Sequence, residues 1–316
     1  MSDAMQLFTE LQDILGRHSA PAGGTVIKNV LIREDEPIRI ETPQGLIEVN
    51  PGLVSPGSGD EIVLNSRVGY SWSRQDLTEF FGVMEPNWQD RVEDGAIDRP
   101  IAISGSRLRA NLFTYNGDFS LQGQVGSSGK VGLALRVFRS NIPSIGELGL
   151  PASAVEVINS RRGMILLTGG TGAGKSTTAA SMIDRVNSTR AGHVITIESP
   201  IEYTHESKGC VITQREVGPN VSSMARGVYD AMREFPIAIL IGEIRETDAA
   251  TAALYAGESG HLVIGTMHSN SAVGGLSKMI GFFPGSEPIT AESLSQSLLG
   301  IFAQTLVPTA DSRGWT

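Results

Sequence analysis

The chain has 316 residues, which is long for one hydrophobic core, so we expect two domains. With 40% hydrophobic and 19% charged residues it has the composition of a globular protein, and no apolar run is long enough to cross a bilayer. The formal net charge of −9 argues against a large basic surface, and therefore against direct nucleic-acid binding.

The start of the chain and its cysteine content indicate a cytoplasmic protein. The first twenty residues carry acids where a signal peptide would carry basic residues and then an apolar run, so we do not expect secretion. The single cysteine, Cys210, excludes an internal disulfide and fits a reducing compartment. We expect it to be a buried structural thiol.

Residues 1–139 predict a mixed α+β domain. Helical spacing of apolar residues predicts helices at 5–15, 71–84 and 88–92, with Ser73 placed to cap the second. Short apolar or alternating runs predict strands at 25–34, 36–42 and 44–50, and antiparallel strands joined by glycine-bearing turns over 99–125 and 130–138. The stretch 50–61 is rich in Pro, Gly and Ser and predicts an irregular loop.

A linker at 140–151 precedes a second domain at 152–316, where the pattern changes. Short apolar runs occur there at 163–170, 193–199, 237–244 and 261–268, and helical stretches lie between most of them. Such alternation is typical of a mainly parallel sheet covered by helices, so the predicted fold class is α/β.

Residues 169–176 match the phosphate-binding pattern G-x-x-x-x-G-K-[ST], between a buried strand and a helix. Glycines let backbone N–H groups face phosphate oxygens, and the start of the helix adds a partial positive charge. Lys175 would reach the β and γ phosphates, and the Ser176 hydroxyl would bind Mg²⁺. The pattern therefore predicts ATP and Mg²⁺ as cofactors, with the nucleotide held by Gly169, Gly170, Thr171, Gly172, Ala173, Gly174, Lys175, Ser176 and Thr177.

A triphosphate site also needs a carboxylate that organises the metal and a group that positions water. Glu243 ends an apolar run, and we expect it beside the phosphate loop on an adjacent strand. Glu198 and Glu202 lie at and just past another strand end; either could orient water, or each could be a solvated loop acid. His261 and His268 flank a further strand and could be structural groups or a γ-phosphate sensor. A metal site is disfavoured here, because no further His or Cys lies near them in the sequence.

Four blocks follow one another in the second domain: "GGTGAGKSTT", "HVITIESPIEYTHESKGCVITQREV", "IAILIGEIRETDAATAALYAGESGHLVIGTMHS" and "SLLGIFAQTL". Together they resemble the type IV pilus retraction and type II/IV secretion ATPases, in particular the PilT-like and DotB-like members. The resemblance runs from about Arg139 to Val307, and more weakly over the first domain. It implies a PAS-like N-terminal domain followed by a RecA-like P-loop ATPase domain whose C-terminal helices are short or absent.

The resemblance also implies roles for individual residues. The catalytic set that it implies is Lys175, Glu202, Glu243, His268, Arg107, Arg109 and Arg136. Glu202 would be the general base, Glu243 the Walker B acid and, with Ser176, a Mg²⁺ ligand, and His268 the sensor in a His box that starts at His261. An arginine supplied across an interface could stabilise the transferring phosphoryl group, although the three arginines could equally be solvated strand residues.

The family forms hexameric rings, so the resemblance implies a homo-hexameric ATPase motor that moves about the linker. It would be cytoplasmic and peripheral at the inner membrane, partnered by inner-membrane and cytoplasmic components of a pilus or secretion machine. Two alternatives are a nucleotide-binding regulatory subunit with little hydrolysis and a RecA-like nucleic-acid motor. The acidic charge of the chain disfavours the latter.

Three departures from the family pattern limit the resemblance. Ser199 replaces the usual Asp of E-D-P-[IV]-E, and "REFPI" at 233–237 replaces an acidic "REDPD", which we expect to remove two negative charges near the site. The chain also stops after "LVPTADSRGWT", where relatives continue through further helices. A conjugation or type IVB secretion role is therefore at least as well supported as pilus retraction.

Overall fold

The computed structural model divides the chain into two compact units, with the division between Ser140 and Asn141. It describes residues 29–42, 45–48, 71–84, 87–88, 96–103, 106–115, 129–137 and 141–307. The helix predicted at 5–15, the loop at 50–61 and all but residue 88 of the helix at 88–92 lie outside the described residues.

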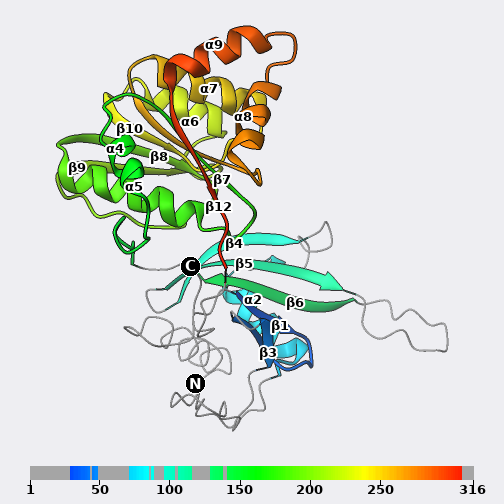
Figure 1. Cartoon of the computed structure of the whole chain (residues 1–316). Coiled ribbons are helices and arrows are strands. Elements are labelled where there is room, and N and C mark those ends of the chain that lie inside the picture. Colours follow the sequence, from blue (N-terminus) through cyan, green and yellow to red (C-terminus); the bar gives the residue numbers. More distant parts are fainter. Residues whose placement is uncertain are drawn as a thin grey trace. The chain divides into compact units, whose positions relative to one another are not determined.

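The first unit contains a six-stranded antiparallel sheet in the order β3-β2-β1-β6-β5-β4 (Figure 1). Its elements are β1 (Asn29–Arg33), β2 (Arg39–Thr42), β3 (Gly45–Glu48), α2 (Arg74–Met84), β4 (Ile97–Ile103), β5 (Ser106–Tyr115) and β6 (Lys130–Val137). The predicted strands are therefore confirmed over the described residues. A sheet that carries a helix on one face is the α+β organisation that the sequence predicts.

Helix α2 begins with a capping box and buries one face. The amide of Asp76 donates to Ser73 Oγ at 3.2 Å, and the amide of Ser73 donates to the Asp76 carboxylate at 2.7 Å, as the predicted Ser73 cap requires. Leu77, Phe80 and Phe81 are buried and join the apolar side chains of the sheet in one core. The period of the apolar residues thus sets which face of α2 packs on the strands.

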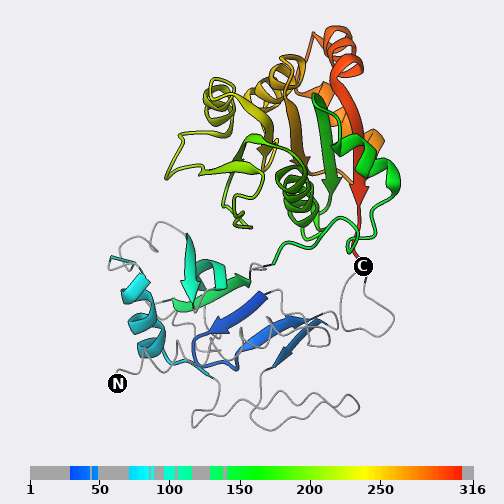
Figure 2. The same cartoon turned by 90° about the vertical axis from the view of Figure 1, so that its left-hand side faces the viewer.

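The second unit contains a six-stranded parallel sheet in the order β12-β7-β11-β10-β8-β9 (Figure 2). Its strands are β7 (Gly163–Gly169), β8 (Gly192–Glu198), β9 (Cys210–Glu216), β10 (Pro236–Ile241), β11 (Leu262–Met267) and β12 (Leu298–Gln304). Its helices are α4 (Ala152–Ile158), α5 (Lys175–Thr189), α6 (Met224–Ala231), α7 (Thr247–Glu258), α8 (Ala272–Gly281) and α9 (Glu287–Ser297).

Alternate side chains of this sheet enter two separate cores, one on each face. Ile165 and Leu167 of β7 pack with α4 and α5, whereas Met164 and Leu166 pack with α6, α7 and α9. Because helices cover both faces, the central strands read as continuous apolar runs. The predicted α/β class and the four predicted strands are confirmed.

Two strands escaped prediction, and both lie at the sheet edges. In β9 the residues from Thr213 to Glu216 are polar and only half-buried, so the segment lacks the apolar run that marks a central strand. Strand β12 follows α9 directly, without a turn signal between them. Residues after 140, within the predicted linker, pack on the second unit, where Ile145 is buried and Pro143 C=O accepts from Ser181 Oγ at 2.6 Å.

Asn187 of α5 fixes the turn that leads into β9. Its side chain is fully buried, donates to Glu206 C=O at 2.7 Å and accepts from the amides of Lys208 and Cys210 at 3.0 and 3.3 Å. Cys210 itself is buried, and its thiol donates to Arg190 C=O at 3.3 Å, which confirms the predicted structural thiol. Among the described residues, no helix is long and apolar enough to span a membrane.

Replacing Asn187 by Ala is expected to lower the free energy of unfolding by about 3 kcal/mol, because three backbone groups would lose the hydrogen bonds that they make with its buried side chain. Urea denaturation followed by circular dichroism measures this. Asn220→Ala is the matched control: Asn220 is exposed and accepts one bond, from Glu216 N at 2.9 Å, so its loss should cost less than about 1 kcal/mol. Equal costs for the two variants would contradict the assignment.

Candidate active site

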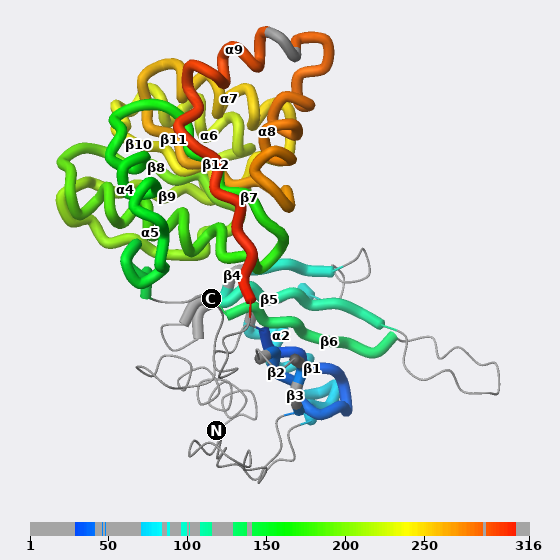
Figure 3. The backbone as a smooth tube through the Cα atoms, viewed as in Figure 1, coloured from blue at the N-terminus to red at the C-terminus, as the bar shows by residue number. Residues whose placement is uncertain are grey.

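The carboxyl ends of parallel strands meet at one edge of the sheet, whose strands are labelled in Figure 3. Most of the predicted site residues lie at this edge. The phosphate loop follows β7, Glu198 ends β8, Glu243 follows β10 and His268 follows β11. The expectation that Glu243 stands on a strand adjacent to β7 is wrong, because β11 lies between β7 and β10. His268 therefore follows the strand next to the loop, and Glu243 the strand beyond it.

The phosphate loop closes around the side chain of Lys175. This residue is buried, and its ammonium donates to Gly169 C=O at 2.9 Å and to Gly170 C=O at 2.8 Å. Burial lowers the pKa of Lys175, although the nearby charges of Glu243 and Glu202 oppose the shift. Helix α5 begins at Lys175 after Gly174, whose φ of 85° is a left-handed conformation that favours glycine. The amino end of α5, with Ser176 and Thr177 half-buried in its first turn, faces the loop.

Glu243 lies beside an arginine and a histidine. One of its oxygens is 2.5 Å from Arg245 Nη2, and the other, Oε1, is 3.1 Å from His268 Nε2. Burial raises the pKa of Glu243, but Arg245, His268 and Lys175 lower it by more, so its pKa lies below the ordinary value. Burial and Lys175 lower the pKa of His268 despite Glu243, so the imidazole is neutral at pH 7.

The predicted Mg²⁺ ligands fit the way this ion binds. Within the described ranges no three His, Cys, Asp or Glu side chains cluster as a metal site. Mg²⁺, however, usually takes one or two protein oxygens and completes its shell with phosphate and water. Glu243 Oε1 is buried without a hydrogen bond of good geometry, so it is an available ligand. With the Ser176 hydroxyl in the first turn of α5, it supplies the oxygen chemistry that the ion prefers.

Glu198 and Glu202 differ in their surroundings. Glu198 is buried, and its Oε1 accepts from Thr196 Oγ1 at 2.7 Å and from Gln214 Nε2 at 3.2 Å. Burial raises the pKa of Glu198 to about 7. Glu202 is half-buried, and its charge acts on Lys175. Of the two acids, Glu202 is thus the one available to a reacting group beside the loop.

Gly242 allows the chain of β10 to pass close to Glu198. A Cβ at Gly242 would come 3.0 Å from Glu198 Cα and 3.3 Å from its Cγ, so a side chain there would push this acid out of place. The Gly242 amide also donates to Ile197 C=O at 2.8 Å. The glycine before Glu243 therefore keeps the two acidic strand ends together.

Two sequence features lie at the opposite, amino-terminal edge of the sheet. His261 precedes β11; its C=O accepts from Gly163 N at 2.9 Å, and its Nδ1 lies 3.2 Å from Ala256 C=O. These contacts favour the structural role among the two that the sequence left open for His261. Phe235 of "REFPI" precedes β10 and is 90% exposed. A six-residue strand spans about 20 Å, so the expectation that "REFPI" removes charges near the site is wrong.

The three predicted arginines belong to the first unit. Arg109 of β5 and Arg136 of β6 are direct cross-strand partners, and Arg107 of β5 pairs in register with Ala102. Arg109 Nε donates to both oxygens of Asp98, at 2.8 and 2.9 Å, and Arg136 is exposed. Their role toward a nucleotide stays a prediction.

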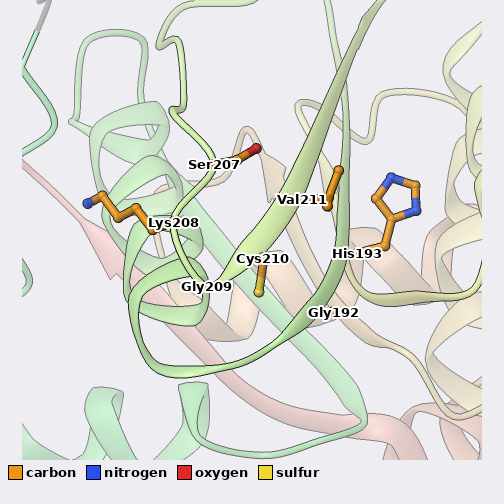
Figure 4. Close-up of a pocket in the computed structure, with 7 residues that line it drawn as sticks. All are labelled: Gly192, His193, Ser207, Lys208, Gly209, Cys210 and Val211. Carbon is orange, nitrogen blue, oxygen red and sulfur yellow. The ribbon is translucent and has the colours of Figure 1, made fainter.

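A hollow of about 610 Å³ lies at the amino-terminal edge, around the starts of β8 and β9 (Figure 4). Figure 4 shows the Lys208 side chain pointing away from His193 and Val211, and its ammonium lies 2.7 Å from Asp184 Oδ1. The Cys210 thiol is buried, and burial raises its pKa. The hollow therefore offers neither a free cation nor a reactive thiol. It lies at the edge of the sheet opposite to the one that carries the phosphate loop.

Comparison with known proteins gives the same family from sequence and from structure. The family described as type II/IV secretion system protein matches residues 128–314. The type IV pilus ATPase PilU of Pseudomonas aeruginosa is 41% identical over 185 residues, which are 58% of this chain and 48% of PilU. The retraction ATPase PilT of the same organism is 38% identical over 203 residues, 64% of this chain and 56% of PilT.

Two solved structures have a similar fold. The pilus retraction motor PilT with bound ADP has a TM-score of 0.74 and 31% identity, over 95% of this chain and 79% of that one. The Legionella pneumophila ATPase DotB has a TM-score of 0.74 and 25% identity, over 98% and 78%. The chain spans about half the length of the curated relatives that it matches.

Replacing Glu198 by Gln is expected to make folding less sensitive to pH. The pKa of this carboxyl is about 7 in the folded protein and 4.5 in the unfolded chain. Its contribution to stability is therefore fully present below pH 4.5 and is lost as the pH rises through 7. The unfolding free energy of Glu198→Gln should therefore rise relative to wild type by on the order of 3 kcal/mol between pH 4.5 and 8. Urea denaturation of both proteins across this range measures the difference, and a constant difference would contradict the buried acid.

Proposed function

We propose that this chain, which belongs to the type II/IV secretion system protein family, hydrolyses ATP to drive a type IV pilus or a type IV secretion machine. One observation carries the proposal. A phosphate loop, an acid with an unbonded buried oxygen, a second, half-buried acid and a neutral histidine gather at one edge of a parallel sheet. Each group matches a task that phosphoryl transfer to water requires.

The phosphate loop would bind the β and γ phosphates of ATP. Backbone N–H groups at the start of α5 face the loop, and the helix adds a partial positive charge there. Lys175 now donates to two main-chain carbonyls, and phosphate oxygens would accept the same donors more strongly because they are charged. The solved PilT structure with bound ADP supports nucleotide binding by this chain.

The acids would divide the chemistry. Ser176 and Glu243 would hold Mg²⁺, which neutralises phosphate charge when it is bound. Glu202 would accept the proton of a water molecule that attacks the γ-phosphorus, while the bond to the bridging oxygen breaks and ADP leaves. Neutral His268, whose Nε2 lies 3.1 Å from Glu243 Oε1, would donate its single N–H toward the γ-phosphate.

The assembly of the motor is part of the proposal. Homo-hexamers at the inner membrane, with membrane and cytoplasmic components of the machine as partners, are what the family suggests. In such a ring an arginine of the first unit, Arg107, Arg109 or Arg136, would approach the phosphates. Because the chain spans about half of PilU and PilT, its activity, cargo and partners rest on experiment.

The test is ATP turnover with Mg²⁺ against protein concentration, with the mass of the assembly measured in the same samples. Glu202→Gln should lower kcat by about 100-fold or more, because the general base is lost. Glu258→Gln, an exposed acid of α7, is the matched control and should leave kcat unchanged. Wild-type turnover that rises with hexamer formation supports a ring motor.

Two outcomes would contradict the motor. Turnover that survives in Glu202→Gln would remove the proposed base. A wild-type protein that binds ATP without turnover at every concentration would indicate the regulatory subunit instead.

A further inference from the structure

The segment between β8 and β9 carries Glu202 and is pinned by side chains of β9. Glu216 Oε2 accepts from Ile201 N at 3.1 Å. Gln214 Nε2 donates to Tyr203 C=O at 2.8 Å, and Gln214 Oε1 accepts from His205 N at 2.8 Å. Main-chain groups on both sides of Glu202 are therefore fixed, and its position depends on these two side chains of β9.

Tyr203 also links this segment to the phosphate loop. Its side chain is 6% exposed, and its hydroxyl lies 2.8 Å from Thr177 Oγ1, which is in the first turn of α5. The bond connects the residue next to the proposed base with a residue of the phosphate-binding pattern. It is a long-range contact, between positions 26 residues apart in the sequence.

Either hydroxyl can donate in this bond, and one of the two directions leaves the Thr177 proton free for a further acceptor. A threonine hydroxyl has one proton to donate and two lone pairs that accept. When Tyr203 donates its proton to Thr177, the proton of Thr177 points elsewhere, and the amino end of α5 is where a phosphate oxygen would accept it. One hydroxyl can thus bind a nucleotide and hold Tyr203 at the same time.

We propose that Tyr203 is a positioning residue: its bond to Thr177 couples an occupied phosphate loop to the segment that carries Glu202. This inference rests on the proposed ATPase function. A nucleotide orders the Thr177 hydroxyl, Tyr203 follows it, and the backbone beside Glu202 is held where the base meets water. Tyr203 itself touches no reacting atom.

Kinetics give the first test. Tyr203→Phe keeps the ring and removes one hydroxyl, so kcat should fall about tenfold while the Kd for a fluorescent ADP analogue stays within about twofold. The melting temperature should stay near that of wild type. Tyr255→Phe, an exposed tyrosine of α7, is the matched control with unchanged kcat. Unchanged kcat in Tyr203→Phe, or a fall that follows a lower melting temperature, overturns the inference.

A double-mutant cycle tests the pathway. Thr177→Val removes the partner hydroxyl and should itself lower kcat. If Tyr203 acts through Thr177, adding Tyr203→Phe to Thr177→Val should change kcat little further. Additive losses would mean that Tyr203 acts through another contact and would overturn the inference.

Hydrogen exchange of the peptide 199–206 separates this inference from the ATPase proposal. Binding of a non-hydrolysable ATP analogue should slow exchange there in wild type and in Tyr255→Phe, but much less in Tyr203→Phe. Equal protection in all three proteins, or bound analogue without protection in wild type, overturns the inference. If exchange shows this pattern in a protein that does not turn over ATP, the coupling is supported and only the proposed ATPase function is contradicted.

Discussion

Parallel pairing of the six strands in the second unit is the constraint on which its chemistry depends. Because β7, β8, β10 and β11 run in one direction, everything that follows each of them falls on one edge. Buried apolar runs hold the strands between two helical layers, so close packing fixes the strand ends that carry the site. Phosphate loop, acids and histidine thereby converge without any local sequence signal that joins them.

The two edges of this sheet have different tasks. The amino-terminal edge is stabilised by satisfied groups: Asn187 bonds three backbone groups, and His261 and Cys210 bond main-chain carbonyls. At the carboxyl edge, polar groups are incompletely satisfied or shifted, as with the unbonded oxygen of Glu243 and the raised pKa of Glu198. Groups of this kind lower stability and are typical of functional sites.

Features carried by single segments of the chain could be predicted from the sequence, whereas features that depend on the order of the strands could not. The loop around Lys175 and the central strands follow from spacing and apolar runs, which are properties of single segments. The edge strand β9 has no such run, and the order β7-β11-β10 cannot be read from the chain, so Glu243 was expected one strand too close. The bond between Tyr203 and Thr177 joins distant positions and has no local pattern. The position of Phe235, by contrast, could be predicted from the sequence, because a residue that precedes a strand lies at the amino end of that strand.

The most direct test of this account is calorimetric titration of ADP with Mg²⁺ into wild-type protein and into Lys175→Ala. The account predicts one site per chain in wild type, and a loss of affinity of at least about tenfold in the variant, because the buried ammonium is the cation that meets the phosphates. Absence of binding to wild type, or equal affinity in the two proteins, would contradict a nucleotide site at the carboxyl edge of the sheet.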